Sequence, residues 1–137
     1  VIQVEGDEWL ETIDTSEKLV SSVEMDAPTI VSKINEAGIV GLGGATFPTH
    51  VKLAPPPGMK AEVLLINGVE CEPYLTADHR LMLEKTDEVL VGTSLLMKAL
   101  GVKRAVIGIE NNKPDAIQKM KERASSYVGI EVCPLKV

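Results

Sequence analysis

Three apolar runs of strand length in the second half of the chain constrain its fold most. They lie at 62–67, 104–110 and 129–135, and two segments with helical patterns, 86–100 and 112–125, separate them. Short links between alternating strands and helices require a parallel sheet with βαβαβ crossovers, so the sequence predicts an α/β fold. Because the first two runs are continuously apolar, we expect these strands to be covered on both faces.

The first half of the chain is less regular. Residues 1–13 predict two short strands about a Gly6-Asp7 turn, and a helix is predicted from an Asp26 cap to a stop at Gly38. We therefore divide the chain into 1–25, strands and a linker that lead from a preceding domain, and 26–137, the α/β domain. A start without Met and an end within a strand pattern indicate a piece of a longer protein.

Two further helix starts are predicted from capping residues. Thr76 is expected to cap a short helix over 76–84, and Asn112 is expected to cap the helix that contains Pro114.

Composition excludes several function classes. With 14 basic and 20 acidic residues the net charge is −6, which argues against a nucleic-acid partner. No apolar run approaches the ~20 residues of a membrane span, so we expect any membrane association to come through partners. Cys71 and Cys133 lie outside any CxxC motif and cannot by themselves hold an iron–sulfur cluster or a structural zinc. We expect two buried thiols.

The stretch "GIVGLGGATFPTHVKL" at 38–53 is the first candidate site. Gly41, Gly43 and Gly44 can bring backbone N–H groups together as an anion nest, although a close crossing of two elements would also need glycines. Lys52 supplies a positive charge suited to a phosphate. Phe47, the only phenylalanine, is held extended by the following proline and is suited to stacking on a planar ring.

The second candidate site is the acidic stretch "NGVECEPYLTADHR" at 67–80. It follows the first parallel strand, and Glu110 ends the second, so both occupy the strand ends where ligands bind in open sheets. Asn67, Glu70 and Glu72 offer acceptors for sugar or polyol hydroxyls. The alternatives are a solvated acidic loop and a metal site that would use Glu70, Glu72, Asp78 and His79. A nest, an aromatic platform and hydroxyl acceptors together suit a flavin mononucleotide or a nicotinamide dinucleotide.

These two stretches carry a family resemblance. "GLGGATFPTHVKL" followed by "INGVECEPYLTADHRLMLE" closely resembles the RnfC subunit of the Rnf ion-translocating electron-transport complex. More distantly it is similar to the 51 kDa flavoprotein subunit of complex I, with its G-R-G-G-A-G-F-P-T-G-x-K-W and N-A-D-E-S-E-P-G patterns. The resemblance covers roughly residues 26–125. It implies the fold of the complex I FMN-binding domain.

The resemblance also implies roles for individual residues. FMN would be held by the nest, the lysine, the amide and two carboxylates: Gly41, Gly43, Gly44, Lys52, Asn67, Glu70 and Glu110. NADH would meet Phe47 and Glu72. No catalytic residue and no metal ligand is implied, because hydride transfer between stacked rings depends on positioning.

Several positions depart from the complex I pattern. Leu42 and Val69 replace its Arg and Asp and so remove two polar ligand contacts, while His50, Leu53 and Tyr74 replace its Gly, Trp and Gly. All of these replacements resemble those usual in RnfC.

For the whole protein, the resemblance implies an electron-input domain of a membrane-associated NADH:ferredoxin-type oxidoreductase complex. Its implied partners are NAD(H), the other Rnf subunits and, indirectly, ferredoxin, and its 4Fe-4S clusters would lie outside this chain. Its implied location is the cytoplasmic side of the cell membrane, as a peripheral protein. Two alternatives stay open, namely a docking fragment that has lost cofactor binding and a metal-dependent hydrolase.

Overall fold

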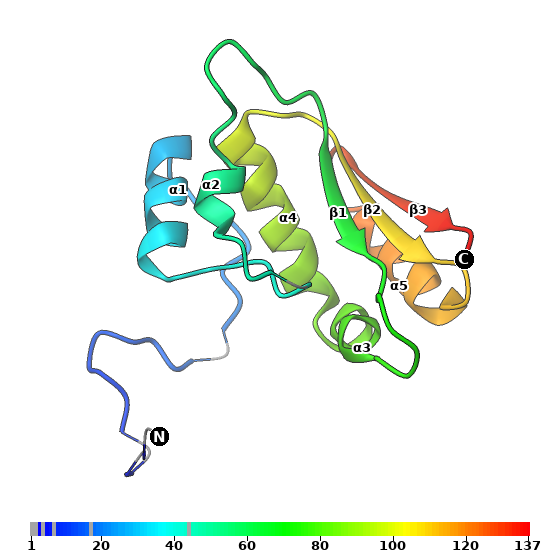
Figure 1. Ribbon diagram of the computed structural model, residues 1–137, viewed down its shortest axis with the longest axis horizontal. Coiled ribbons are helices and arrows are strands. Elements are labelled where there is room, and N and C mark those ends of the chain that lie inside the picture. The colour runs from blue at the N-terminus through cyan, green and yellow to red at the C-terminus, as the bar shows by residue number, and fades with distance from the viewer. Residues whose placement is uncertain (1–2, 4, 7, 17, 44) are drawn as a thin grey trace.

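The computed structural model describes residues 3, 5–6, 8–16, 18–43 and 45–137, and its centre is a three-stranded parallel sheet (Figure 1). Both neighbouring pairs are parallel, in the order β1-β2-β3, and Ala105 of β2 lies between Leu64 and Ile130. The predicted α/β fold with a parallel sheet is therefore confirmed. The strands are β1 (Leu64–Gly68), β2 (Ala105–Glu110) and β3 (Ile130–Leu135).

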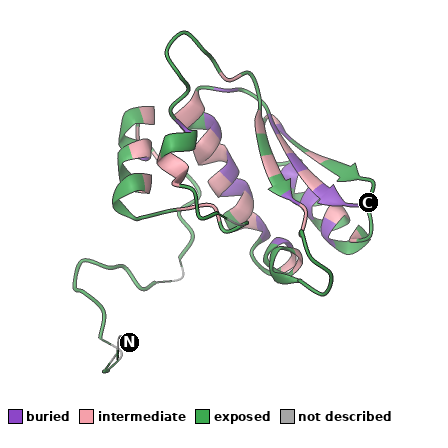
Figure 2. Ribbon diagram, viewed as in Figure 1, coloured by how far each residue is buried: buried purple, intermediate pink, exposed green. Residues whose placement is uncertain are grey.

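Helices pack on one face of this sheet and form the core with it. Ala105, Ile107 and Ile109 alternate along β2, and each is at most 1% exposed. They pack against buried side chains of the helices, such as Leu90 and Met120. Figure 2 shows this buried layer between the sheet and the helices. The helices are α3 (Ala77–Glu84), α4 (Thr86–Leu100) and α5 (Pro114–Ala124).

The other face of the sheet is open among the described residues, so the prediction of strands covered on both faces is wrong here. Leu65 is 71% exposed and Leu135 40% exposed. Cys133, on the edge strand β3, and Cys71, in the loop after β1, are both exposed free thiols, which corrects the expectation of buried ones. The apolar runs place apolar side chains on both faces of the sheet, but the described helices cover only one face.

A second, smaller unit precedes the sheet. It consists of α1 (Ala27–Glu36) and the single-turn helix α2 (Thr49–Lys52), which the sequence did not predict. The Asp26 carboxylate accepts a hydrogen bond of 3.0 Å from the Thr29 amide, which confirms the predicted cap. Buried Ile30 anchors α1, and α1 packs against both α2 and α4. This unit holds the glycine-rich segment beside the sheet domain.

The structure corrects other local predictions. No described residue of 1–13 forms a strand, and Val1, Ile2, Val4 and Asp7 lie outside the described residues. Thr76 and Asn112 are not side-chain caps, because α3 has no cap bond from Thr76 and Lys113 occupies the N-cap position of α5. The helix predicted over 86–100 is confirmed as α4, and it ends at Gly101, whose φ is 68°. None of the helices that the structure describes has both the length and the apolar character to cross a bilayer.

Candidate functional site

The glycine-rich segment 40–48 is a loop closed at its base by backbone contacts. Val40 and Pro48 form an isolated antiparallel bridge, and the Thr49 amide donates to the Ile39 carbonyl over 3.1 Å. Inside the loop the Gly41 amide donates to the Phe47 carbonyl over 3.0 Å. Main-chain contacts therefore hold the two ends of this segment together.

A lysine, a glycine and an aromatic ring come together on this loop. Lys52 Nζ lies 2.6 Å from the point that a Cβ on Gly41 would occupy, so glycine here admits the ammonium group. The same Nζ lies 6.0 Å from the centroid of the Phe47 ring, within reach of a cation–π contact. Phe47 is 50% exposed. The structure thus brings together three of the residues predicted to bind cofactors.

The anion nest is altered in one respect. Because the Gly41 amide already donates within the loop, Gly41 contributes space for Lys52 and its N–H is engaged. A Cβ at Gly43 would meet no described atom within 4 Å, so the fold itself does not require a glycine there. Gly44, the third predicted nest residue, lies outside the described residues.

The second predicted group is a buried ionic cluster at the carboxyl ends of β1 and β2. Lys113 Nζ contacts a carboxylate oxygen of Glu70 and lies 2.9 Å from one of Glu110. The three side chains are 11%, 4% and 10% exposed, respectively. The structure therefore unites Glu70 and Glu110, as predicted from their positions at strand ends, through a lysine that the prediction did not include.

Glu70 also stabilises the start of α3. Its Oε1 accepts a hydrogen bond of 2.9 Å from the Asp78 amide, in the first turn of that helix, while its Oε2 accepts from Lys113. Thr76 holds the N-cap position of α3 without a side-chain bond, and the Glu70 carboxylate, eight residues before Asp78, accepts from the helix start instead. Both oxygens of Glu70 are engaged within the protein.

The pKa values of the cluster follow from these contacts. Burial, the largest single influence, raises the pKa of Glu70, but the hydrogen bonds from Lys113 and from the Asp78 amide outweigh it and leave the pKa below its ordinary value. Burial lowers the pKa of Lys113, and the bonds to Glu70 and Glu110 outweigh this, so that pKa is raised. Both shifts favour the charged forms of Glu70 and Lys113.

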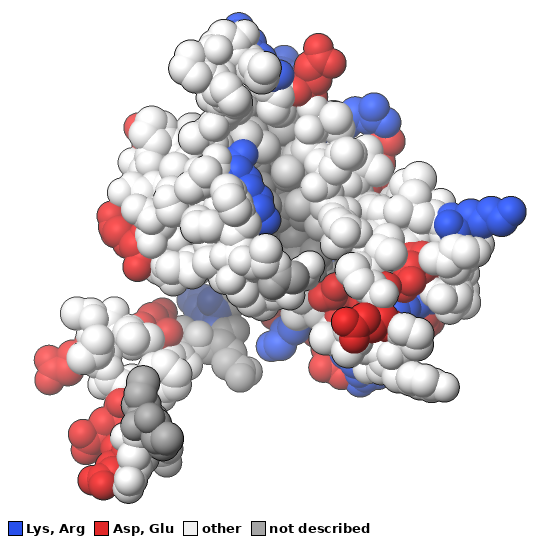
Figure 3. Space-filling view, viewed as in Figure 1, with Lys and Arg blue, Asp and Glu red and all other residues white. Residues whose placement is uncertain are grey.

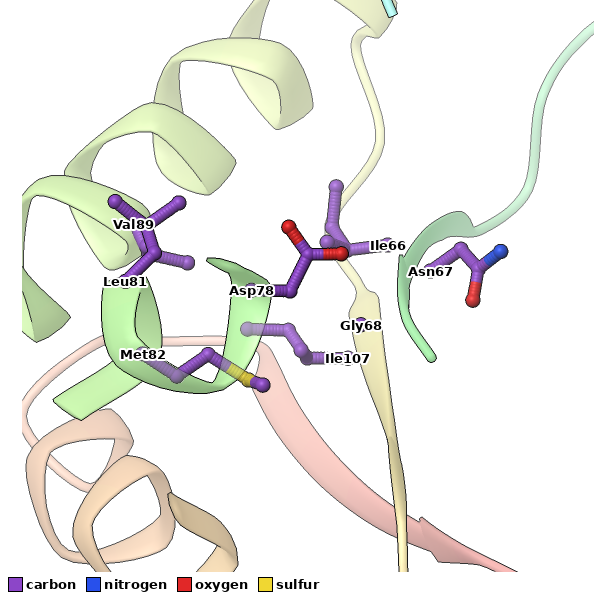
Figure 4. A pocket seen from close by; sticks show the side chains of 8 residues that line it. All are labelled: Ile66, Asn67, Gly68, Asp78, Leu81, Met82, Val89 and Ile107. Carbon is purple, nitrogen blue, oxygen red and sulfur yellow. The ribbon is translucent and has the colours of Figure 1, made fainter. Parts of the chain in front are cut away.

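Asn67 and Glu72, the remaining predicted contacts, are exposed. The Asn67 Oδ1 accepts a hydrogen bond of 3.1 Å from the Val69 amide, which leaves its side-chain nitrogen for another partner. Figure 4 shows Asn67 pointing away from the apolar side chains around Met82, whereas the Asp78 carboxylate points into the space between α3 and Ile66. No side-chain bond or ion pair joins Glu72 to any described residue.

Neither cavity at the sheet is large enough for a nucleotide. One, of about 80 Å³, lies on the helix-covered side at Gly68 and Met82. The other, of about 270 Å³, lies on the open face of the sheet between Leu65 and Leu135. Ligand pockets usually exceed ~300 Å³. The surface itself is hollowed between α2 and β1, with a basic side chain along the α2 edge and acidic side chains over the strand ends (Figure 3).

The metal alternative finds no geometric support. Within the described ranges no three His, Cys, Asp or Glu side chains gather closely enough to hold an ion. His79 instead donates to Asp115 over 2.9 Å and links α3 to α5. This bond is the main reason that the pKa of Asp115 is held below its ordinary value. Arg80, in the same stretch, pairs with Glu84 one helical turn further on.

Lys113 is the residue that the sequence interpretation missed. A signal was present, because a cation at the N-terminal end of a helix opposes the helix dipole. Such a residue is stabilised when carboxylates surround it, and Glu110 stands three positions before it. The contribution of Glu70, 43 positions away, depends on the sheet bringing two strand ends together.

Residues 34–137 match the family described as the Nuo51 FMN-binding domain. The C subunit of the proton-translocating ferredoxin:NAD(+) oxidoreductase complex of Clostridium ljungdahlii is 54% identical over 89% of this chain and 26% of that protein. The C subunit of the Na(+)-translocating complex of Acetobacterium woodii is 49% identical over 98% of this chain and 30% of that protein. The chain therefore spans less than a third of these relatives.

A solved structure shares the fold. The NAD+-reducing NiFe hydrogenase in its air-oxidized state aligns with a TM-score of 0.63 at 26% identity, over 80% of this chain and 20% of the hydrogenase chain. In its H2-reduced state the TM-score is 0.58 at 25% identity.

Proposed function

Because the chain belongs to the family of Nuo51 FMN-binding domains, we propose that it is the electron-input domain of an NADH:ferredoxin-type oxidoreductase complex. In this role it binds FMN and NAD(H) and delivers electrons to iron–sulfur centres that lie outside the chain. The names of the relatives support the assignment, since both are subunits of ferredoxin:NAD(+) oxidoreductase complexes.

The observation that carries the proposal is the cluster of Gly41, Phe47 and Lys52. An exposed cation beside a closed backbone loop is suited to a phosphate group, and an exposed ring beside that cation is suited to a planar heterocycle. Gly43 fits the same interpretation, because nothing in the described fold fills the space next to it. FMN offers the phosphate for Lys52, and NAD(H) offers a planar nicotinamide ring for Phe47.

The carboxyl end of the sheet supplies the remaining contacts. The side-chain nitrogen of Asn67 and the exposed carboxylate of Glu72 are available to hydroxyl and amide groups of a ligand. Glu70 and Glu110 approach the site through the Lys113 cluster, so we assign them to fixing the loop after β1. Bound FMN would supply the redox chemistry, in which two electrons arrive as a hydride and leave one at a time. The chain would supply the orientation of the bound groups.

NAD(H) would bind next to the exposed face of Phe47, with Glu72 on its ribose or nicotinamide side. The expected partners are the other subunits of the complex, with ferredoxin reached indirectly. Association with the membrane would be peripheral, through those subunits, on the cytoplasmic side.

Titration of the 137-residue chain with FMN tests the proposal directly. We expect a red-shifted flavin spectrum and quenched flavin fluorescence. Lys52→Ala should weaken FMN binding about tenfold, which corresponds to ~1.4 kcal/mol.

Lys60→Ala is the matched control, because it removes an exposed lysine from the segment just after α2. It should leave the FMN affinity unchanged. Free-flavin behaviour at high protein concentration, with a native circular dichroism spectrum, would refute the proposal.

A docking fragment without cofactor is the second candidate. It is favoured by the Gly41 amide, which is engaged within the loop, and by Leu42 and Val69, which stand where the complex I pattern has polar residues. Capture of the other complex subunits without any uptake of FMN would support it.

A further inference from the structure

The cluster of Glu70, Glu110 and Lys113 joins four elements at one end of the sheet. Glu70 follows β1, Glu110 ends β2 and Lys113 begins α5, and through the Asp78 amide Glu70 also contacts the first turn of α3. Each of these positions lies at the carboxyl end of a strand or at the start of the helix that follows a strand. In a parallel sheet that is the end where ligands bind.

Stability alone is a weak reason for burying three charges. Removing two ions from water costs several kcal/mol each, and apolar side chains of similar volume are often as stable. Two carboxylates and one ammonium also leave a net negative charge within the cluster. The cluster is stable despite this desolvation cost, and it lies at the ligand-binding end of the sheet. It is therefore suited to holding a segment in one position.

The segment in question is 69–78, between β1 and α3. It carries Glu72, and few backbone bonds hold it, among them one of 3.3 Å from the Leu75 amide to the Glu72 carbonyl. Its two ends are fixed by side chains, since Asn67 accepts from the Val69 amide and Glu70 accepts from the Asp78 amide. Lys113 is the cation that keeps Glu70 charged and buried in that place.

We propose that Lys113 is a positioning residue of the flavin site, and that it acts through Glu70 to hold segment 69–78 against the strand ends. This inference rests on the proposed function. The ammonium group does not meet the ligand. It sets the place of the Glu70 carboxylate, the Glu70 carboxylate fixes the start of α3, and the loop between them presents Glu72 and the amides of the segment to the ligand.

The test compares Lys113→Met, Lys113→Arg and Lys121→Met in the 137-residue chain. Two quantities are measured for each variant, namely residue-resolved amide hydrogen exchange without ligand and the Kd for FMN. Lys121→Met is the matched control, because it removes an exposed lysine from the same helix. We expect Lys113→Met to accelerate exchange of the Asp78 amide at least tenfold and to raise the Kd at least tenfold. Lys113→Arg should recover part of both effects, and Lys121→Met should change neither.

Each result supports or overturns the inference. Unchanged exchange at Asp78 in folded Lys113→Met overturns it. Faster exchange with an unchanged Kd also overturns it, because Lys113 would then act on the fold alone. If the unsubstituted chain takes up no FMN, the proposed function fails, while the exchange data still decide whether Lys113 fixes the segment. Should Lys113→Met not fold, Glu70→Gln replaces it, with an expected threefold or greater acceleration at Asp78; no acceleration overturns the inference.

Discussion

The two halves of the candidate site are built in different ways. The loop of Gly41, Phe47 and Lys52 is closed by main-chain bonds, and its functional side chains are exposed. The cluster of Glu70, Glu110 and Lys113 is held by buried side-chain ion pairs, and both oxygens of Glu70 are engaged by Lys113 and the Asp78 amide. The side chains of the loop are therefore accessible to a ligand, whereas the charged groups of the cluster stabilise the fold.

This difference predicts that substitutions in the two halves separate stability from binding. Changes in the ionic cluster should lower the free energy of unfolding and weaken binding as a consequence. Changes in the glycine-rich loop should weaken binding while the fold remains.

The largest effect is expected for Glu70→Ala. It removes the bond to the Asp78 amide and one partner of Lys113, and we expect a loss of about 2–3 kcal/mol in the free energy of unfolding. Glu72→Ala, two residues away and exposed, should change stability by less than ~0.5 kcal/mol. Urea denaturation of both variants measures the contrast. Equal losses would show that the cluster is no more important to the fold than the loop around it.

The fold itself was largely predictable from sequence, because its helices and strands have local signals. The helical pattern over 86–100 placed α4 at Thr86–Leu100, and the apolar runs placed the strands and indicated that they are parallel. The open face of the sheet was not predictable, since the run around Leu65 is apolar whether or not a second layer covers it. The N-terminal strands were predicted from local pattern alone, and the described residues there have no neighbouring strand to pair with.

The site was predictable where neighbours in sequence meet in space. Gly41, Phe47 and Lys52 lie within twelve positions and form a cluster, and the resemblance to RnfC drawn from the same stretch is confirmed by the relatives. Lys113 could not be assigned in this way, because its pairing with Glu70 depends on the register of β1 and β2. Thr76 occupies the N-cap position of α3 as predicted, but Glu70 supplies the side-chain acceptor there, which the local pattern did not indicate.

A second prediction concerns pH and distinguishes the ionic half from the loop. The pKa of folded Glu70 lies below its ordinary value of 4.5, so its contribution to stability is complete above about pH 4.5 and is lost as the pH falls through the folded pKa. The pKa of Lys113 lies above 10.5, so its contribution is lost only as the pH rises beyond that value. The unsubstituted chain should therefore exceed Glu70→Gln in free energy of unfolding by a constant amount near neutral pH. This difference should become smaller in acid. Its size should stay below the loss in Glu70→Ala, because glutamine keeps the side-chain volume. Thermal denaturation of both proteins across the acid range measures this difference. A difference that grows in acid would contradict a lowered pKa for Glu70.

The third prediction concerns Gly41→Ala, which should affect the loop with little cost to the fold. A Cβ at this position would lie 2.6 Å from Lys52 Nζ, and the end of a flexible side chain can move away. We expect a stability change below ~1 kcal/mol. The displaced ammonium should weaken FMN binding about tenfold, or ~1.4 kcal/mol. Gly92→Ala in α4, where an added Cβ would meet no described atom within 4 Å, is the control and should leave the affinity unchanged. Equal FMN affinities of Gly41→Ala and Gly92→Ala would show that Lys52 does not contact the FMN phosphate.

The fourth prediction concerns Phe47→Leu, and it sharpens the comparison most. The ring is half exposed, and its contact with Lys52 at 6.0 Å is of a kind that contributes about 0.5–1 kcal/mol at exposed sites. We therefore expect a loss of no more than ~1 kcal/mol in the free energy of unfolding. Since FMN would be held chiefly by its phosphate, the Kd for FMN should stay the same. The rate of anaerobic flavin reduction by NADH should fall about tenfold, because the stacking partner of the nicotinamide is lost. An unchanged rate would remove Phe47 from the NADH site and leave it as a packing partner of Lys52, whereas a raised Kd for FMN would place the flavin itself against this ring.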